Sequence, residues 1–238
     1  MASPMQQLLP SRHPVQHPAG GLTSLYLVRH GRTLGNVQRA LCGWTDLPLD
    51  DLGLQQAQLV ANRLGESVKA DVLLTSPLQR ALKTASYISE QTGLEPVIRQ
   101  NLKEWNFGQA EGMTFEVLSH RFPDIAVRFM DEKDFDAGWP DGETRRQFHD
   151  RVYQEFLSIL HDYHDHTLVV VAHGGFFGSL MSQVQGRSPN NWLAYDIKNC
   201  SVSHIEVSLE DTAVHLLNSV EHLEVLESGQ TEEWTESA

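Results

Sequence analysis

Short apolar runs alternate along this sequence with longer stretches in which apolar residues recur every three or four positions. The short runs are rich in Val, Ile and Leu, which is typical of strands in a buried sheet. Strands are predicted at residues 24–28, 70–76, 167–173, 201–207 and 213–220. The last two are expected to pair as a hairpin around Glu210 and Asp211. The run "TLVVVAH" is continuously apolar, as expected of a strand covered on both faces.

The longer stretches have the periodicity of amphipathic helices. Helices are predicted over residues 52–64, from Pro77 to about residue 89, from Glu143 to about His161, and from Gly174 onward. Each has an apolar stripe that would face the sheet. Strands alternating with helices predict one α/β domain over residues 22–220, built on an open, mostly parallel sheet with helices on both faces.

The two ends of the chain depart from this pattern. Residues 1–21 hold four of the ten prolines and are interpreted as a flexible arm. Residues 221–238 hold six Glu and neither Lys nor Arg, which predicts an acidic flexible tail. The arm lacks the apolar core of a signal peptide, and no run reaches the length of a transmembrane helix.

Composition narrows the classes of partner. The 238 residues are 40% hydrophobic and carry 18 basic and 31 acidic side chains, for a net charge of -13. This excess argues against nucleic acid or an anionic membrane surface as the main partner. The two cysteines, Cys42 and Cys200, have neither metal-site nor redox spacing. They are expected to be reduced thiols in a cytoplasmic protein.

Positively charged and imidazole side chains follow three of the predicted strands. Arg29 and His30 end the first strand, Arg80 lies just after the second, and His173 and Gly174 follow the apolar run at 167–173. Ligands of open α/β sheets bind beyond the carboxyl ends of the strands. We therefore expect two arginines and two histidines to gather at one edge of the sheet.

This group of residues suits a phosphoryl ligand. Two guanidinium groups and a helix amino terminus at Gly174 would hold a dianion. The same positive charge would lower the pKa of His30 and leave it neutral, with a nitrogen lone pair able to attack phosphorus. A departing alkoxide needs a proton. Glu104, flanked by apolar residues and therefore partly desolvated, is the candidate donor, with Glu111 as the alternative.

Five segments in a fixed order carry a family resemblance. They are "RHGRTLGN" (29–36), "LCGWTDLPLDDLG" (41–53), "SPLQRALKTA" (76–85), "LKEWNFGQAEG" (102–112) and "VAHGGFFGSLM" (171–181). They resemble the motifs of the histidine phosphatase superfamily, the phosphoglycerate mutase-like proteins. With "NCSVSHIEV" as the late strand, the similarity covers residues 25–207. It is nearest to the broad-specificity and α-ribazole phosphatases.

The resemblance implies a role for each matching residue. His30 would be the phosphorylated nucleophile, and Glu104 the proton donor and later the base that activates water. The phosphoryl group would be held by Arg29, Asn36, Gly43, Arg80, His173 and Gly174. Neither a metal nor another cofactor is implied, because two arginines supply the charge that Mg²⁺ supplies elsewhere. The partner would be a small phosphorylated substrate, and the protein a monomer or a homodimer.

Some positions leave their interpretation open. Many members of the family have Glu where this chain has Arg32, and Trp or Ala where it has Gly35. Arg32 either favours a substrate with a second anionic group or points into water. Trp44 and Trp139 either line the substrate pocket or pack in the core. The tract "HDYHDH" (161–166) resembles a metal-binding tract but lies at a predicted helix end, where cationic side chains suit the dipole.

The short, acidic stretch "FMDEKDFDAGWPDGET" (129–144) separates the functional alternatives. Mutases of this family carry a longer insertion there, with basic residues that hold a carboxylate. The sequence therefore favours a phosphomonoesterase for a small metabolite over a phosphoglycerate mutase. A phosphoprotein phosphatase is a further alternative. A non-catalytic binding module is disfavoured because the chemical residues are all retained.

Overall fold

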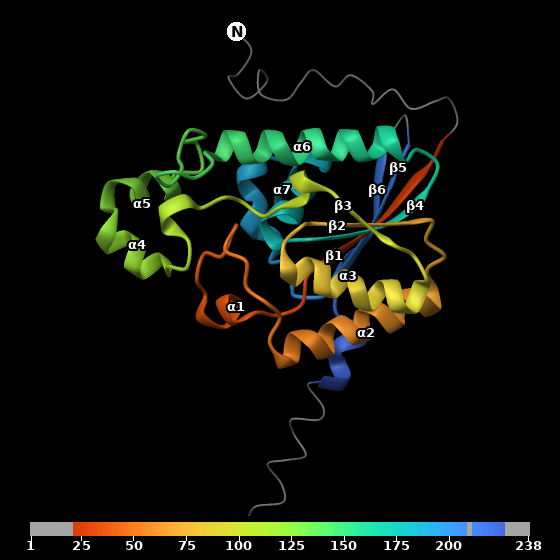
Figure 1. Ribbon diagram of the computed structural model, residues 1–238. Coiled ribbons are helices and arrows are strands. Elements are labelled where there is room, and N and C mark those ends of the chain that lie inside the picture. Colours follow the sequence, from red (N-terminus) through yellow and green to blue (C-terminus); the bar gives the residue numbers. More distant parts are fainter. Residues whose placement is uncertain (1–20, 209–210, 227–238) are drawn as a thin grey trace, which may run out of the picture.

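The computed structural model describes residues 21–208 and 211–226 of the chain. This part forms one mixed sheet with strand order β3-β2-β4-β1-β5-β6 (Figure 1). The strands are β1 (Thr23–Arg29), β2 (Val72–Thr75), β3 (Pro96–Ile98), β4 (Thr167–Ala172), β5 (Val202–Val207) and β6 (Thr212–Ser219). Strands β3, β2, β4 and β1 are parallel, whereas β5 is antiparallel to both of its neighbours. The predicted open, mostly parallel sheet is confirmed, and β5 and β6 form the predicted hairpin.

Helices cover both faces of the sheet, as predicted. The helices are α1 (Leu34–Gln38), α2 (Asp51–Ser67), α3 (Gln79–Thr92), α4 (Phe115–Arg121), α5 (Pro123–Met130), α6 (Arg145–Asp162) and α7 (Gly174–Val184). In Figure 1, α6 and α7 lie above the sheet, and α2 and α3 lie below it. Each pair closes its own hydrophobic cluster against the strands. Burying apolar side chains on both faces fixes the sheet and so fixes the strand ends.

Local sequence determines where the helices begin. Asp50 caps α2 by accepting the N–H of Gly53, and Thr144 forms a capping box with Gln147 at the start of α6. The predicted start of α6 at Glu143 was therefore two residues too early. The α3 helix ends at Gly93, whose φ of 74° is the left-handed conformation that glycine adopts without strain.

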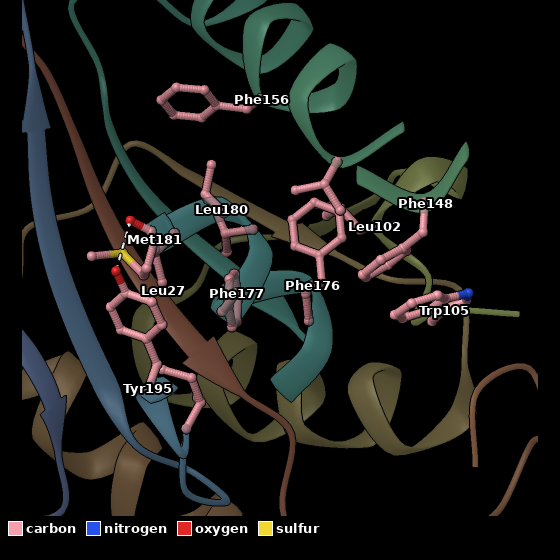
Figure 2. Packing of buried hydrophobic residues seen from close by; sticks show 14 of the residues in the cluster. Leu27, Leu102, Trp105, Phe148, Phe156, Phe176, Phe177, Leu180, Met181 and Tyr195 are labelled. Carbon is pink, nitrogen blue, oxygen red and sulfur yellow. Dashed lines mark hydrogen bonds between the residues drawn. The ribbon is translucent and has the colours of Figure 1, made fainter. Parts of the chain in front are cut away.

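An aromatic cluster joins α6 and α7 to the loop that carries Glu104. Trp105 is fully buried and stacks on Phe148 of α6 with ring centroids 4.7 Å apart, and Figure 2 shows both rings beside Leu102 and Phe176. Trp139 is 2% exposed and packs with its centroid 5.1 Å from that of Phe129. Of the two possibilities for Trp139, the structure therefore favours packing.

The sequence prediction lacked several short elements, among them the five-residue helix α1. Strand β3 has only three residues and begins with a proline, and α4 and α5 are short helices on either side of Phe122. The predicted arm, apart from Gly21, and residues 227–238 of the predicted tail lie outside the described residues. Residues 221–223 pack on the domain through Leu223, which is 9% exposed. A search of the described helices finds none long and apolar enough to span a membrane.

Candidate active site

The carboxyl ends of β1, β2 and β4 meet at a cavity of about 230 Å³. Six of the predicted site residues line this cavity: Arg29, His30, Asn36, Arg80, Glu104 and Gly174. His173 lies beside them, because its ring centroid is 5.1 Å from that of His30. Residues that are far apart in the sequence therefore lie together because their strands end at the same edge of the sheet.

His30 is held as a neutral imidazole with one defined tautomer. Its side chain is 4% exposed, and Nδ1 lies 2.7 Å from the carbonyl oxygen of Gly31. A carbonyl oxygen only accepts, so Nδ1 carries the proton and Nε2 keeps its lone pair. Burial, followed by the positive charges of Arg80 and Arg29, lowers the pKa of His30 well below its usual value. A neutral imidazole with an available Nε2 can act as a nucleophile.

His173 is fully buried next to His30. Its Nε2 lies 2.7 Å from the hydroxyl oxygen of Ser76, at the end of β2. Burial and the charge of Arg80 lower the pKa of His173 well below its usual value. Its Nδ1 has no hydrogen-bond partner among the described residues. If the Ser76 hydroxyl donates to Nε2, Nδ1–H is a donor that a phosphoryl oxygen would satisfy.

Two arginines supply positive charge to the cavity. The Arg80 guanidinium is 2% exposed and donates to the carbonyl oxygens of Cys42 at 3.2 Å, Gly43 at 2.6 Å and Thr45 at 2.9 Å. Arg29 Nε is buried and has no partner among the described residues. Burial lowers the pKa of both arginines from their usual value, but an arginine side chain stays charged in proteins. The pair can therefore bind a dianion.

Glu111 organises the loop that orients Arg80. Its carboxylate accepts four backbone N–H groups at 2.8–3.1 Å, from residues 43 to 45 and from Phe107. Gly43, predicted to bind substrate, is not part of the cavity lining described above. A Cβ at Gly43 would lie only 1.7 Å from a backbone oxygen of Trp105, so the loop can pack there only with glycine. Glu111 is therefore occupied by the framework, which favours Glu104 as the proton donor.

Glu104 is fixed at both oxygens and at its backbone. Oε2 accepts the N–H of Gly175 at 2.8 Å, and Oε1 accepts the N–H of Trp105 at 3.0 Å. A Cβ at Gly175 would lie 2.5 Å from Oε1, so a larger residue there would push the Glu104 carboxylate away from the α7 amino terminus. The indole N–H of Trp44 donates to the Glu104 carbonyl oxygen at 2.9 Å. Trp44 is therefore not a wall of the cavity but a support for Glu104.

An ion pair between Arg151 of α6 and Glu143, which lies just before the helix cap, supports the same loop. Arg151 makes two hydrogen bonds of 2.7 Å to the carboxylate of Glu143. Arg151 also donates to the carbonyl oxygens of Lys103 at 2.8 Å and Glu104 at 3.0 Å. A bidentate pair of this kind fixes both position and orientation. No pattern in the sequence separated Arg151 from an ordinary surface residue of an amphipathic helix.

Asn36 presents its amide nitrogen to the cavity. Its Oδ1 accepts the N–H of Thr33 at 3.0 Å and the side-chain amide of Asn199 at 3.2 Å. Asn199 also donates to the carbonyl oxygen of His30 at 3.0 Å. With Oδ1 occupied, the remaining hydrogen-bonding group of Asn36 is a donor, which suits an anionic ligand.

Arg32 does not line the cavity that holds His30 and Arg80. Its Nε lies 2.8 Å from Asp50, and the side chain lines a separate hollow. This geometry argues against Arg32 as a contact for a second anionic group of the substrate. The histidine tract at 161–166 is similarly removed from the site. Among the described residues, no group of three or more His, Cys, Asp and Glu side chains is arranged to hold a metal.

Sequence reasoning missed the supporting residues Ser76, Glu143, Arg151 and Asn199, and the apolar wall formed by Trp192, Leu193 and Ile197. Ser76 and Asn199 stand within segments that carry the family resemblance, so that signal could have found them. The wall residues follow α7 in and after a 3-10 segment (Pro189–Tyr195) that has no clear periodicity. Their position depends on tertiary packing against the cavity.

The fold and this arrangement suit the binding of a phosphoryl group beside a histidine that can act as a nucleophile. The chain belongs to the histidine phosphatase superfamily (branch 1), whose family pattern matches residues 25–220. It is 32% identical over 205 residues to the uncharacterized phosphatase PhoE of Bacillus subtilis, covering 85% of this chain and 97% of that protein. It is 31% identical over 169 residues to a 2,3-bisphosphoglycerate-dependent phosphoglycerate mutase of Bartonella tribocorum, covering 68% and 82%.

Solved structures agree with the fold and the family. The α-ribazole phosphatase of Shigella flexneri superposes with a TM-score of 0.74 at 27% identity, covering 82% of this chain and 96% of that one. Phosphoserine phosphatase of Entamoeba histolytica, solved with 3-phosphoglyceric acid, superposes with a TM-score of 0.75 at 27% identity, covering 84% and 99%. The predicted superfamily is confirmed, and the solved structures similar to this chain include α-ribazole phosphatases.

Proposed function

We propose that this protein is a metal-independent phosphomonoesterase that hydrolyses small phosphorylated molecules through a phosphohistidine on His30. The observation that carries the proposal is the state of the His30 ring. Gly31 fixes the proton on Nδ1, and burial with two arginines keeps the imidazole neutral. Phosphatase relatives such as PhoE add support.

The first chemical step transfers the phosphoryl group to the protein. Arg29, Arg80 and the α7 amino terminus hold the phosphoryl oxygens, while His30 Nε2 attacks phosphorus in line with the leaving oxygen. The P–O bond to the alcohol breaks as the N–P bond forms. Glu104 gives its proton to the departing alkoxide, because its carboxyl group lines the cavity and is held there by the N–H of Gly175.

The second step releases phosphate. A water molecule takes the place of the alcohol and attacks the phosphohistidine, while the carboxylate of Glu104 removes a proton from it. The N–P bond breaks, and its electron pair returns to His30 Nε2. Inorganic phosphate then leaves the two arginines. No metal is required in this scheme, because the guanidinium groups balance the charge.

Hydrolysis is favoured over mutase activity by the charges on the cavity wall. Among the described residues that line the cavity, the cations are Arg29 and Arg80, and both face the phosphoryl group. A mutase would need a further cation to hold the carboxylate of its intermediate. The stretch between α5 and α6 is acidic, and none of its residues adds a cation to the cavity lining. Two unpaired cysteines are consistent with a reducing, cytoplasmic location, which is part of the proposal.

The test uses 3-phosphoglycerate in the presence of a strong chelator. We expect inorganic phosphate to appear faster than 2-phosphoglycerate, with a rate that the chelator does not change. Isomer formation that outruns phosphate release would move the assignment to a mutase. Loss of turnover on chelation, restored by Mg²⁺ or Zn²⁺, would contradict metal independence.

A further inference from the structure

The end of β1, which carries His30, contacts the turn that precedes β5. Because β5 runs antiparallel to β1, its start lies beside the end of β1, where Val202 pairs with Val28. Just before β5, the backbone N–H of Cys200 donates to the carbonyl oxygens of Arg29 at 2.9 Å and His30 at 3.3 Å. The backbone position of His30 therefore depends on the turn at Cys200.

The turn at Cys200 has an uncommon backbone conformation. Cys200 is fully buried, and its φ of 52° lies in the left-handed region that residues other than glycine seldom adopt. Such a conformation persists only where neighbouring contacts fix it. The carbonyl oxygen of Cys200 lies 2.9 Å from Nε2 of His222, in the segment that follows β6. His222 thus supplies one of the contacts that fix the turn.

His222 is held in one tautomer. Its Nε2 carries the proton because the Cys200 carbonyl oxygen only accepts, and its Nδ1 accepts from the Arg63 guanidinium at 3.0 Å. Arg63 of α2 also donates to the hydroxyl of Ser219 at 3.0 Å. Burial, followed by the charge of Arg63, lowers the pKa of His222 to about 4, so the ring is neutral near pH 7. The imidazole is therefore anchored to α2 and presents a fixed donor to Cys200.

The segment that carries His222 lies beyond the family pattern. That pattern matches residues 25–220, and Leu223 packs on α2 directly after His222. Figure 1 shows this end of the described chain in dark blue beside α2. The family match therefore assigns nothing to the contact between His222 and Cys200.

We infer that His222 is a positioning residue: its Nε2–H fixes the Cys200 turn, and the turn fixes the end of β1 so that His30 is aligned for attack on phosphorus. This inference rests on the proposed function and deepens it. Small displacements of a reacting group lower the rate steeply. The loop at residues 42–45 orients Arg80, so phosphate binding depends much less on His222 than the attack does.

Two substitutions separate the hydrogen bond from the volume of the ring. His222→Phe keeps a ring but has no donor, whereas His222→Gln keeps an amide N–H that can reach the Cys200 carbonyl oxygen. Rapid quench measures the rate of phosphohistidine formation from p-nitrophenyl phosphate, and calorimetry measures affinity for inorganic phosphate. We expect His222→Phe to slow phosphohistidine formation by about tenfold or more, and His222→Gln by less than about threefold. Phosphate affinity should change by less than about threefold in both variants.

A control separates positioning from a general loss of stability. Phe156→Leu removes packing from the cluster under α6, on the opposite face of the sheet, and should leave the rate unchanged. Rates are compared at a temperature where denaturation curves show each variant to be folded. If His222→Phe does not fold, Arg63→Met replaces it, because loss of the guanidinium frees His222 to take the other tautomer. Phosphohistidine formation should then slow by about threefold or more.

The outcomes separate the role of His222 from the proposed function. A folded His222→Phe variant, or Arg63→Met in its place, that forms phosphohistidine at the unmodified rate would overturn the inference. Equal slowing in His222→Gln or in Phe156→Leu would also overturn it, because the effect would then not come from the N–H. So would a loss of phosphate affinity as large as the loss of rate. An unmodified protein that forms no phosphohistidine would overturn the proposed function itself.

Discussion

Glu111→Gln tests whether the framework behind Arg80 controls phosphoryl binding. Glutamine keeps the size of the side chain but replaces one carboxylate oxygen with an amide that cannot accept. Two of the four N–H donors, those of Gly43 and Thr45 on Oε2 in the simplest orientation, would then lose their partner. Each partly buried donor left unsatisfied costs about 1–2 kcal/mol, so the loop would lose about 2–4 kcal/mol.

The loss should appear at Arg80 because the same loop supplies the carbonyl oxygens that orient its guanidinium. We expect affinity for inorganic phosphate and kcat/KM for p-nitrophenyl phosphate to fall by about 10–100-fold. This fold-change corresponds to the part of the energy lost from the loop that weakens phosphate binding. Phosphate affinity is measured by calorimetry at a temperature where denaturation curves show the variant to be folded. Glu90→Gln, which removes an exposed acid from α3, is the matched control.

Two results would refute this reasoning. Phosphate affinity equal to that of the unmodified protein, in a folded Glu111→Gln variant, would show that Glu111 does not position Arg80. Normal phosphate affinity combined with a selective loss of phosphohistidine formation from alkyl phosphates would instead make Glu111 the proton donor.

Two further predictions concern proton transfer and pH. In Glu104→Gln, the rate of the pre-steady-state burst of phosphohistidine should fall by about 10²–10⁴-fold for alkyl phosphates. It should fall much less for p-nitrophenyl phosphate, because that leaving group needs no proton. Equal slowing of the two bursts would show that Glu104 is not the general acid. Burial lowers the pKa of His149 to about 3, so below about pH 6.5 the unfolded chain binds a proton there that the native chain does not. The free energy of unfolding should therefore fall with decreasing pH, by about 1.4 kcal/mol per unit from this group. Urea denaturation between pH 7 and 5 should give a shallower dependence for His149→Gln, and equal slopes would contradict the assignment.

One physical reason explains why the sheet and the grouping of the charged site residues could be predicted from the sequence. Parallel strands end at the same edge, so side chains such as His30 and His173 meet although 143 positions separate them. Periodicity located α2, α3 and α7 because their apolar stripes face the sheet. It missed α4 and α5, which are short and pack mainly on each other and on the aromatic cluster.

The supporting contacts could not be derived from the sequence pattern. Arg151 of α6 binds Glu143, which precedes the helix, and donates to backbone oxygens of a loop 47 and 48 positions earlier in the chain. Such contacts depend on where α6 packs and not on a local motif. The apolar wall around Leu193 is likewise set by the path of the chain after α7. We expect these parts of the site to position the strand-end residues, which carry the proposed chemistry.

The central claim is that His30 carries the phosphoryl group, and one measurement tests it most directly. The protein is mixed with a radiolabelled phosphomonoester, quenched within milliseconds in alkali, and digested for peptide mapping. We predict an alkali-stable, acid-labile label on the peptide that contains His30, and its absence from His30→Ala. A label on Ser76 or Thr33, or full turnover by His30→Ala, would contradict the account.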